Sequence, residues 1–206
     1  MRFILSCVLV FCIPCWGAPP SEAAQRSQLT VLLTFEQPHS AESFTAIQTQ
    51  LQSLLSKAGL TVDLRDRSET PARAEFSHLV LFRMKGHCTT NPLPIAALSD
   101  ERGPLAMAYS SDGKILPFGE VECDRVRKSL DRVLWRTKDS ANQSALGTAL
   151  ATVLAHEIYH MLGDRVKHTH DGITKSSLSA HELLDGRLSL PDVAEAAIKT
   201  RVQPVR

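Results

Sequence analysis

The sequence has almost no excess charge of either sign and few aromatic residues. Its 206 residues include 23 lysines and arginines and 22 acids, so the formal net charge is +1. Because binding a run of phosphates requires clustered cations, this balance argues against nucleic acid as a partner. Aromatic residues make up only 5% of the chain, but 43% hydrophobic residues suffice for the core of one domain, or of two small ones.

Long apolar runs, long linkers and internal repeats are also missing. No apolar run reaches the ~20 residues of a membrane-spanning helix, so no stable membrane span is expected. Because no linker divides the chain, residues 29–206 are expected to form one domain. The Gly-x-Ser-x-Gly pattern that presents a serine nucleophile is absent, which excludes that hydrolase motif.

The first seventeen residues have the pattern of a secretory signal peptide. Arg2 is followed by the uncharged residues 3–15 and then by Trp16, Gly17, Ala18 and two prolines. A basic start, an apolar stretch and small residues at its end are features of such signals. We therefore predict a signal peptide at residues 1–17, a flexible segment at residues 18–28, and a secreted or periplasmic protein.

Cysteine is scarce in the rest of the chain. Three of the five cysteines lie within the predicted signal peptide, so only Cys88 and Cys123 remain after its removal. Two cysteines in an oxidising compartment suggest one disulfide bond. The alternative is a pair of buried free thiols, because the sequence has no spacing motif that would decide between them.

The remaining chain alternates patterns of strands and helices, which predicts an α/β (α+β) fold. A strand, a helix and two more strands are expected first, at residues 29–35, 41–58, 60–64 and 78–84. Asp112-Gly113, between apolar runs at residues 105–109 and 114–118, predicts a hairpin that completes a twisted mixed sheet. Further helices are expected at residues 124–135, 141–162 and about 191–200.

The helix predicted at residues 141–162 contains the most specific chemical motif. Ser140 and Gln143 form a capping-box pattern before it, and Gly163 follows it. Within it, His156-Glu157-Ile158-Tyr159-His160 has the H-E-x-x-H pattern, which places two imidazoles on one helical face within reach of one zinc ion. Glu157 is rotated about 100° from His156, so its carboxylate is suited to act as general base toward an attacking water.

This helix resembles the zinc-binding helix of the zincin metalloproteases. His-Glu-Ile-Tyr-His-Met-Leu-Gly, residues 156–163, is similar to the metzincin branch, in which a glycine three residues after the second histidine lets the chain turn back. The wider run 156–184 is also similar to short secreted bacterial proteins of zincin type. The resemblance implies a zincin-like domain at residues 29–206, a Zn²⁺ cofactor and a peptide or protein substrate.

A catalytic zinc ion usually has three protein ligands, so one more is needed beyond His156 and His160. The metzincin position for it is occupied by Val166, which has no donor atom. His168 is favoured as the third ligand, because it is the first residue after the turn that has an imidazole. His170 is the second choice.

Two further features bear on the zincin resemblance: a glutamate that could be the third ligand, and a methionine that is missing. In the other large zincin branch, the third ligand is a glutamate about twenty residues after the second histidine, and Glu182 lies at a similar distance. Ser179 and Glu182 also form a capping-box pattern, which explains this glutamate more simply. Metzincins place a methionine beneath the metal, but no methionine follows Met161, and residues 172–175 match that turn only by loose analogy.

Neighbouring side chains are assigned simpler roles. Tyr159 points about 100° away from His160, so we expect it to pack or to support the site rather than to act on substrate. Asp164, Asp171 and Asp185 are candidates for orienting an imidazole through its second nitrogen, although each is better explained as an ordinary surface acid.

Two functions are compatible with these residues. The first is an exported zinc-dependent peptidase, in which His156, His160 and His168 bind the metal and Glu157 is the general base. An edge strand within residues 105–118 would hold the substrate extended. The second is a secreted zinc-binding domain without turnover. A closed structural site needs four ligands and no base, so the acid next to His156 favours hydrolysis. The sequence predicts no oligomeric state.

Overall fold

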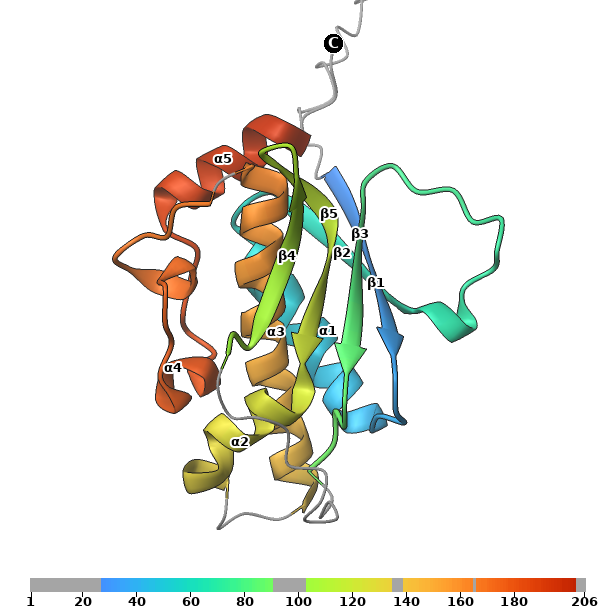
Figure 1. Cartoon of the computed structure of the whole chain (residues 1–206), viewed down its shortest axis with the longest axis vertical. Helices are drawn as coiled ribbons and strands as arrows, with labels where there is room; N and C mark the ends of the chain where they lie inside the picture. The colour runs from blue at the N-terminus through green and yellow to red at the C-terminus, as the bar shows by residue number, and fades with distance from the viewer. Residues whose placement is uncertain (1–26, 91–102, 135–138, 165, 203–206) are drawn as a thin grey trace, which may run out of the picture.

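A mixed five-stranded sheet forms one layer of the molecule, and two helices pack along one of its faces (Figure 1). The structure is a computed structural model that describes residues 27–90, 103–134, 139–164 and 166–202. The signal peptide predicted at residues 1–17, and residues 18–26 of the segment predicted to be flexible, lie outside the described residues. The predicted α/β class, with a mixed sheet on a long helix, is confirmed.

The sheet is built from a β-α-β-β unit followed by a hairpin, as predicted. The strands and the first helix are β1 (Ser27–Phe35), α1 (Ala41–Ser56), β2 (Leu60–Asp66), β3 (Leu79–Lys85), β4 (Ala106–Ser111) and β5 (Lys114–Glu122). In space the strand order is β2-β1-β3-β5-β4. The first four strands of this order run parallel, and β4 runs antiparallel to β5. Within the described residues, β4 therefore forms one edge of the sheet.

Alternating side chains divide the sheet into a buried face and an outer face. On the buried face, β1 contributes Leu29, Val31 and Leu33 and β3 contributes Val80 and Phe82, all nearly inaccessible to solvent. The outer face of β3 and β5 carries ion pairs instead, which join the cations Arg83 and Lys85 to the acids Glu36, Glu120 and Glu122. The period of two along β3 and β5 explains why one face of these strands meets the helices and the other carries charged side chains.

The hairpin has the tight turn that the sequence predicts. Asp112 and Gly113 both have positive φ, at 52° and 75°, which is the conformation of a two-residue type I′ turn. A register shift between Ala108 and Ser110 interrupts the pairing of β4 with β5. Such a bulge re-aims the strand locally, here at the part of β4 nearest the histidine-bearing helix.

The longest helix, α3 (Asp139–Gly163), packs against α1 and also contacts β4 and β5. The other helical segments are η1 (Arg67–Glu69), α2 (Cys123–Leu134), η3 (Gly172–Thr174), α4 (Ala180–Leu184) and α5 (Asp192–Val202). Of these, α2, η3, α4 and α5 contact α3 directly. None of the helices in the described part of the chain combines the length and hydropathy of a membrane-spanning segment.

Two details of the prediction were wrong. The capping box of Ser140 and Gln143 does not form, because α3 begins at Asp139 and Gln143 is buried. The Gln143 amide oxygen instead accepts hydrogen bonds from the Ser40 hydroxyl and the Thr90 amide, so a tertiary contact replaces the local one. Strand β1 starts at Ser27 rather than at residue 29, because its pairing with β2 already begins at Ser27. Trp135, predicted at the end of α2, lies outside the described residues.

Cys88 and Cys123 form a disulfide bond, so the predicted pairing is confirmed. The bond connects the chain just after β3 to the first residue of α2, and both cysteines are fully buried. It thereby ties the start of α2 to the chain that leaves the C-terminal end of β3, an inner strand, and the two cysteines are 35 residues apart in sequence.

Reduction of this disulfide should destabilise the protein. Closing a loop of this length restricts the unfolded chain, which is worth roughly 3 to 4 kcal/mol. We expect urea unfolding with a reductant to give a free energy of unfolding lower by about that amount. The double variant Cys88→Ala/Cys123→Ala is the control, because its stability should not respond to reductant. Equal stability of the wild-type protein with and without reductant would contradict the prediction.

Candidate metal centre

Helix α3 places His156 and His160 one turn apart on the same face. Their Nε2 atoms are 3.1 Å apart, and their ring centroids are 4.8 Å apart. The helix is locked in rotation at this point, because Ala155, Ile158 and Tyr159 beside them are buried in the core. The two imidazoles therefore converge, as the i, i+4 spacing requires.

The orientation of His156 is fixed by a backbone carbonyl. Its Nδ1 lies 2.7 Å from the carbonyl oxygen of Ile173, in η3. Since a carbonyl can only accept, Nδ1 carries the proton and Nε2 presents its lone pair toward His160. Burial, together with the neighbouring histidines His160 and His168, lowers the pKa of His156 to about 4, so the ring is neutral at physiological pH. A neutral imidazole with a free Nε2 lone pair is the form that binds metal ions.

His168 reaches the same point from the segment after the helix. Its ring centroid lies 5.1 Å from that of His156 and 4.9 Å from that of His160. One ligand atom from each of the three side chains falls within 4.8 Å of the others. The chain reverses at Asp164, which has φ of 49° and accepts a hydrogen bond from the Ile115 amide of β5. This turn returns the chain toward α3.

The turn that follows His168 is held together by its own hydrogen bonds. The Thr169 amide donates to the Thr174 carbonyl, and the Thr169 hydroxyl donates to the Asp171 carbonyl. The hydroxyls of Thr169 and Thr174 also contact each other. These bonds fix His168 relative to η3, whose Ile173 carbonyl orients His156.

The other ligand candidates lie elsewhere. His170 is exposed and stands outside the three-histidine cluster. Glu182 forms the predicted capping box with Ser179 at the start of α4 and an ion pair with Lys175. The bond from Lys175, followed by those from Ser179, lowers the pKa of Glu182 to about 2. Among the alternatives considered, the structure therefore groups His168, and neither His170 nor Glu182, with the two helical histidines.

The donor set suits a divalent zinc ion. Bonds of about 2.0–2.1 Å in a tetrahedral site place two imidazole nitrogens about 3.3 Å apart, close to the separation of the His156 and His160 Nε2 atoms. Three imidazoles without sulfur suit zinc and similar transition-metal ions better than the hard cations, which prefer oxygen ligands. Within the described residues, the cluster has three donors, as in catalytic zinc sites.

No family model and no curated protein matches this chain. The resemblance to the zincins therefore stays a prediction based on residues 156–163. The geometry of the three imidazoles stands independently of that family, because it follows from the positions of α3 and the segment after it.

Glu157 lies beside the cluster and is almost fully buried, at 7% exposure. Burial raises the pKa of its carboxyl to about 7, while a backbone hydrogen bond from Ala108 opposes this shift. Ala108 belongs to the edge strand β4, so the edge strand and the motif glutamate meet at the site.

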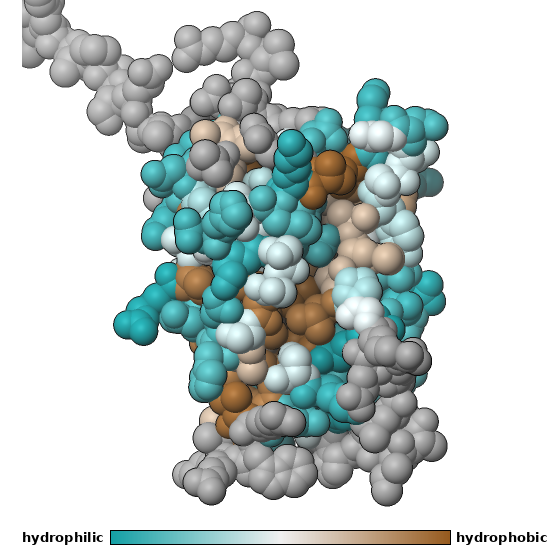
Figure 2. Space-filling view, turned by 60° about the vertical axis from the view of Figure 1, so that its left-hand side comes forward, coloured by the Kyte–Doolittle hydropathy of each residue, from teal (hydrophilic) through white to brown (hydrophobic). Residues whose placement is uncertain are grey.

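The three histidines and Glu157 line a cleft of about 620 Å³. Strand β4 forms one wall, and the segment from Lys175 to Leu178 forms another. Aliphatic side chains dominate the lining and come from several elements: Leu105, Met107, Ile115, Val153, Val166, Leu178 and Leu183. Figure 2, which turns this side of the molecule forward, shows hydrophobic side chains near the centre of a largely hydrophilic face. The cleft therefore combines a largely apolar lining with the three clustered histidines and Glu157.

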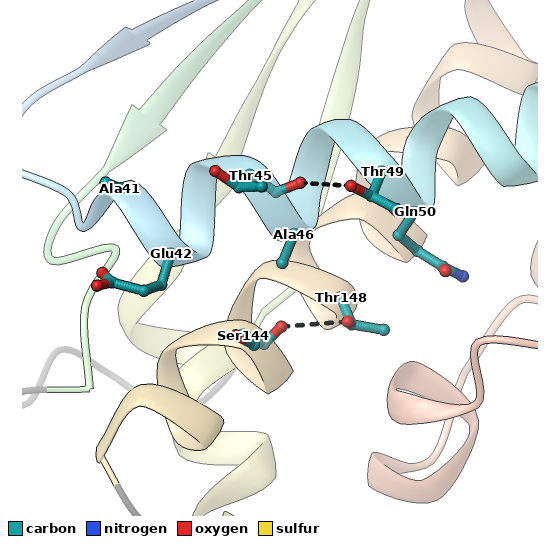
Figure 3. Close-up of a pocket in the computed structure, with 8 residues that line it drawn as sticks. All are labelled: Ala41, Glu42, Thr45, Ala46, Thr49, Gln50, Ser144 and Thr148. Atoms are coloured by element: carbon teal, nitrogen blue, oxygen red, sulfur yellow. Dashed lines mark hydrogen bonds between the residues drawn. The ribbon is translucent and has the colours of Figure 1, made fainter.

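A second hollow, of about 520 Å³, lies between α1 and α3 and has a different character (Figure 3). Two of its threonine hydroxyls bond within their own helices, since Thr49 donates to the Thr45 carbonyl and Thr148 donates to the Ser144 carbonyl. Glu42 is the single ionisable residue among those that line it. This hollow therefore has no cluster of catalytic or metal-binding side chains.

Three supporting contacts were not predicted from the sequence. The Ile173 carbonyl performs the orienting role that had been considered for nearby aspartates, and Ala108 contacts Glu157 through its backbone. Backbone groups give no residue-type signal, so the sequence could not have identified these two. The third contact is the hydrogen bond from the Tyr159 hydroxyl to the Lys167 carbonyl. The signal for it in the sequence was the tyrosine between the two histidines.

Replacement of His168 and of His170 should have unequal effects on metal binding. His168→Ala removes one of three imidazoles, so we expect zinc affinity to fall by more than the roughly 10- to 100-fold that supporting residues contribute. His170→Ala, the matched control two residues away, should retain the wild-type affinity. Zinc titration of both purified variants checks this prediction. A loss of affinity confined to His170→Ala would show that the third ligand is assigned wrongly.

Proposed function

We propose that this protein is a zinc-dependent peptidase that hydrolyses peptide bonds. One observation carries the proposal: three imidazoles meet in a cleft next to a buried carboxylate, and the free edge of a sheet faces them. Zinc binding alone would require the imidazoles only. The adjacent Glu157 and the length of cleft along β4 are what hydrolysis of an extended chain requires.

In this proposal the histidines bind Zn²⁺ through imidazole nitrogens, and the Ile173 carbonyl keeps His156 in the correct tautomer. Zinc would supply Lewis acidity, which polarises a peptide carbonyl and lowers the pKa of water to about 7. His168 is the exposed member of the three, and His160 is buried. The cluster is thus open to the cleft on one side and closed by α3 on the other.

Glu157 is the proposed general base. A carboxylate oxygen of Glu157 takes the proton from the attacking water and later gives it to the amide nitrogen that leaves as an amine. The Ala108 amide supports the carboxylate from β4, so the base is held between the helix and the edge strand. Glu157 follows His156 in sequence but is rotated around the helix from it, so its carboxylate can accept the proton without binding the metal.

The proposed substrate is an extended polypeptide with apolar side chains. Strand β4 pairs with β5 on one side, and within the described residues its other side pairs with no strand. Free amides and carbonyls of an edge strand bind an added strand through main-chain hydrogen bonds. The aliphatic lining, which includes Leu105 just before β4, Ile115 of β5 and Leu178 after η3, favours apolar side chains over charged ones.

A zinc-binding domain without turnover is the alternative function. A closed structural zinc site has four protein ligands. The cluster supplies three among the described residues, and the cleft lies open beside it, which supports hydrolysis. We further propose export to an oxidising compartment, because the pairing of Cys88 with Cys123 is typical of exported proteins.

Glu157→Gln should separate metal binding from catalysis. We expect the variant to bind one zinc ion per chain but to lose at least ~100-fold in hydrolysis, the scale of a general base. The substrate is a quenched-fluorescent library of extended peptides rich in apolar residues. Glu75→Gln is the matched control, since it removes the same charge from an exposed loop residue.

Two results would contradict the proposed function. Full turnover by Glu157→Gln would reject Glu157 as the base. A wild-type protein that binds zinc but cleaves no peptide of the library would favour the zinc-binding domain without turnover.

A further inference from the structure

Tyr159 lies between the two helical histidines in sequence and is buried in the core, with 2% of its surface exposed. Its ring packs near that of His160, with centroids 5.1 Å apart. Its hydroxyl donates a hydrogen bond to the carbonyl oxygen of Lys167, over 3.2 Å. A core residue of α3 therefore binds the backbone of the segment that returns toward the helix.

This hydrogen bond fixes the residue immediately before His168. The side chains of Val166, Lys167 and His168 are all exposed, and that of Val166 is 76% exposed, so burial of these side chains contributes little to holding the segment. After His168, the bonds between Thr169 and Thr174 hold the chain. His168 is thus held from both sides, and the bond on its N-terminal side comes from Tyr159.

We infer that Tyr159 is a positioning residue for the third metal ligand. Its hydroxyl holds the Lys167 carbonyl so that the His168 imidazole is directed toward His156 and His160 before the metal binds. Because the exposed segment is then already ordered before the metal binds, metal binding does not have to offset the entropy lost on ordering it. The affinity for zinc is therefore higher. Supporting partners of this kind are typically worth 10- to 100-fold in metal affinity. The inference rests on the proposed function only in requiring that the three histidines bind zinc.

The tyrosine hydroxyl has a purely structural explanation as well, because buried hydroxyls need hydrogen-bond partners in any protein. The two explanations differ in what they predict. If the hydroxyl only satisfies its own bonding, its removal changes the stability of the metal-free protein and leaves zinc affinity unchanged. If it positions His168, its removal lowers zinc affinity, and this effect requires His168.

The test compares Tyr159→Phe with Tyr109→Phe, because the chain has two tyrosines. Phenylalanine keeps the ring and removes the hydroxyl alone. Tyr109 lies on β4, its ring packs against Phe118 and its hydroxyl bonds to Glu120, so it contacts the outer face of β5 and is not part of the histidine cluster. Zinc affinity is measured by competition with a chelating dye, and the thermal midpoint of each metal-free variant is measured in parallel. We expect about a tenfold or greater loss of affinity for Tyr159→Phe and none for Tyr109→Phe.

A double-mutant cycle with His168→Ala then tests the route of the effect. In the His168→Ala background, where two imidazoles remain, we expect Tyr159→Phe to cause no further loss of zinc affinity. Wild-type affinity in Tyr159→Phe would overturn the inference, and so would an equal loss with and without His168. A wild-type protein that binds no zinc would instead overturn the proposed function and the inference with it, so the two failures are distinguishable.

Discussion

The hydrogen bond between the His156 Nδ1 and the Ile173 carbonyl is the contact on which the rest of the site depends. It joins the helix that carries two histidines to the turn that follows the third. Because it fixes the ring and its tautomer, it also determines which nitrogen of His156 faces His160. The same turn begins directly after His168. This interaction therefore sets the tautomer of the first imidazole and ties α3 to the turn that follows the third.

The sheet matters to this site because it brings an edge strand close to α3. Gly119 of β5 shows how close the packing is, since a Cβ atom there would lie 2.4 Å from the Met107 carbonyl oxygen and 3.0 Å from Met161 Cε. A side chain at this position would push β4 or α3 away from β5. The close approach lets the backbone of Ala108 contact Glu157, so the strand proposed to bind substrate and the proposed base are in direct contact.

Local patterns were sufficient to predict most of the fold, and spacing was sufficient to predict two of the three histidines. The β-α-β-β start, the Asp112-Gly113 turn and the long helix depend on periodicity and turn chemistry, which are visible in sequence. The spatial strand order and the buried role of Gln143 depend on contacts distant in sequence, so local patterns could not supply them. His168 was favoured over His170 by order along the chain alone, whereas its place in the cluster depends on backbone bonds from Tyr159, Thr169 and Thr174.

The central claim is that three imidazoles hold one zinc ion and leave a coordination position open. X-ray absorption at the zinc edge, on protein loaded with one equivalent of zinc, measures the number and type of ligands directly. The account predicts three imidazole nitrogens at about 2.0–2.1 Å and one oxygen ligand from water. Four protein ligands would contradict it, because a closed site cannot activate water, and a zinc ion bound by fewer than three imidazoles would exclude the cluster of His156, His160 and His168 as the site.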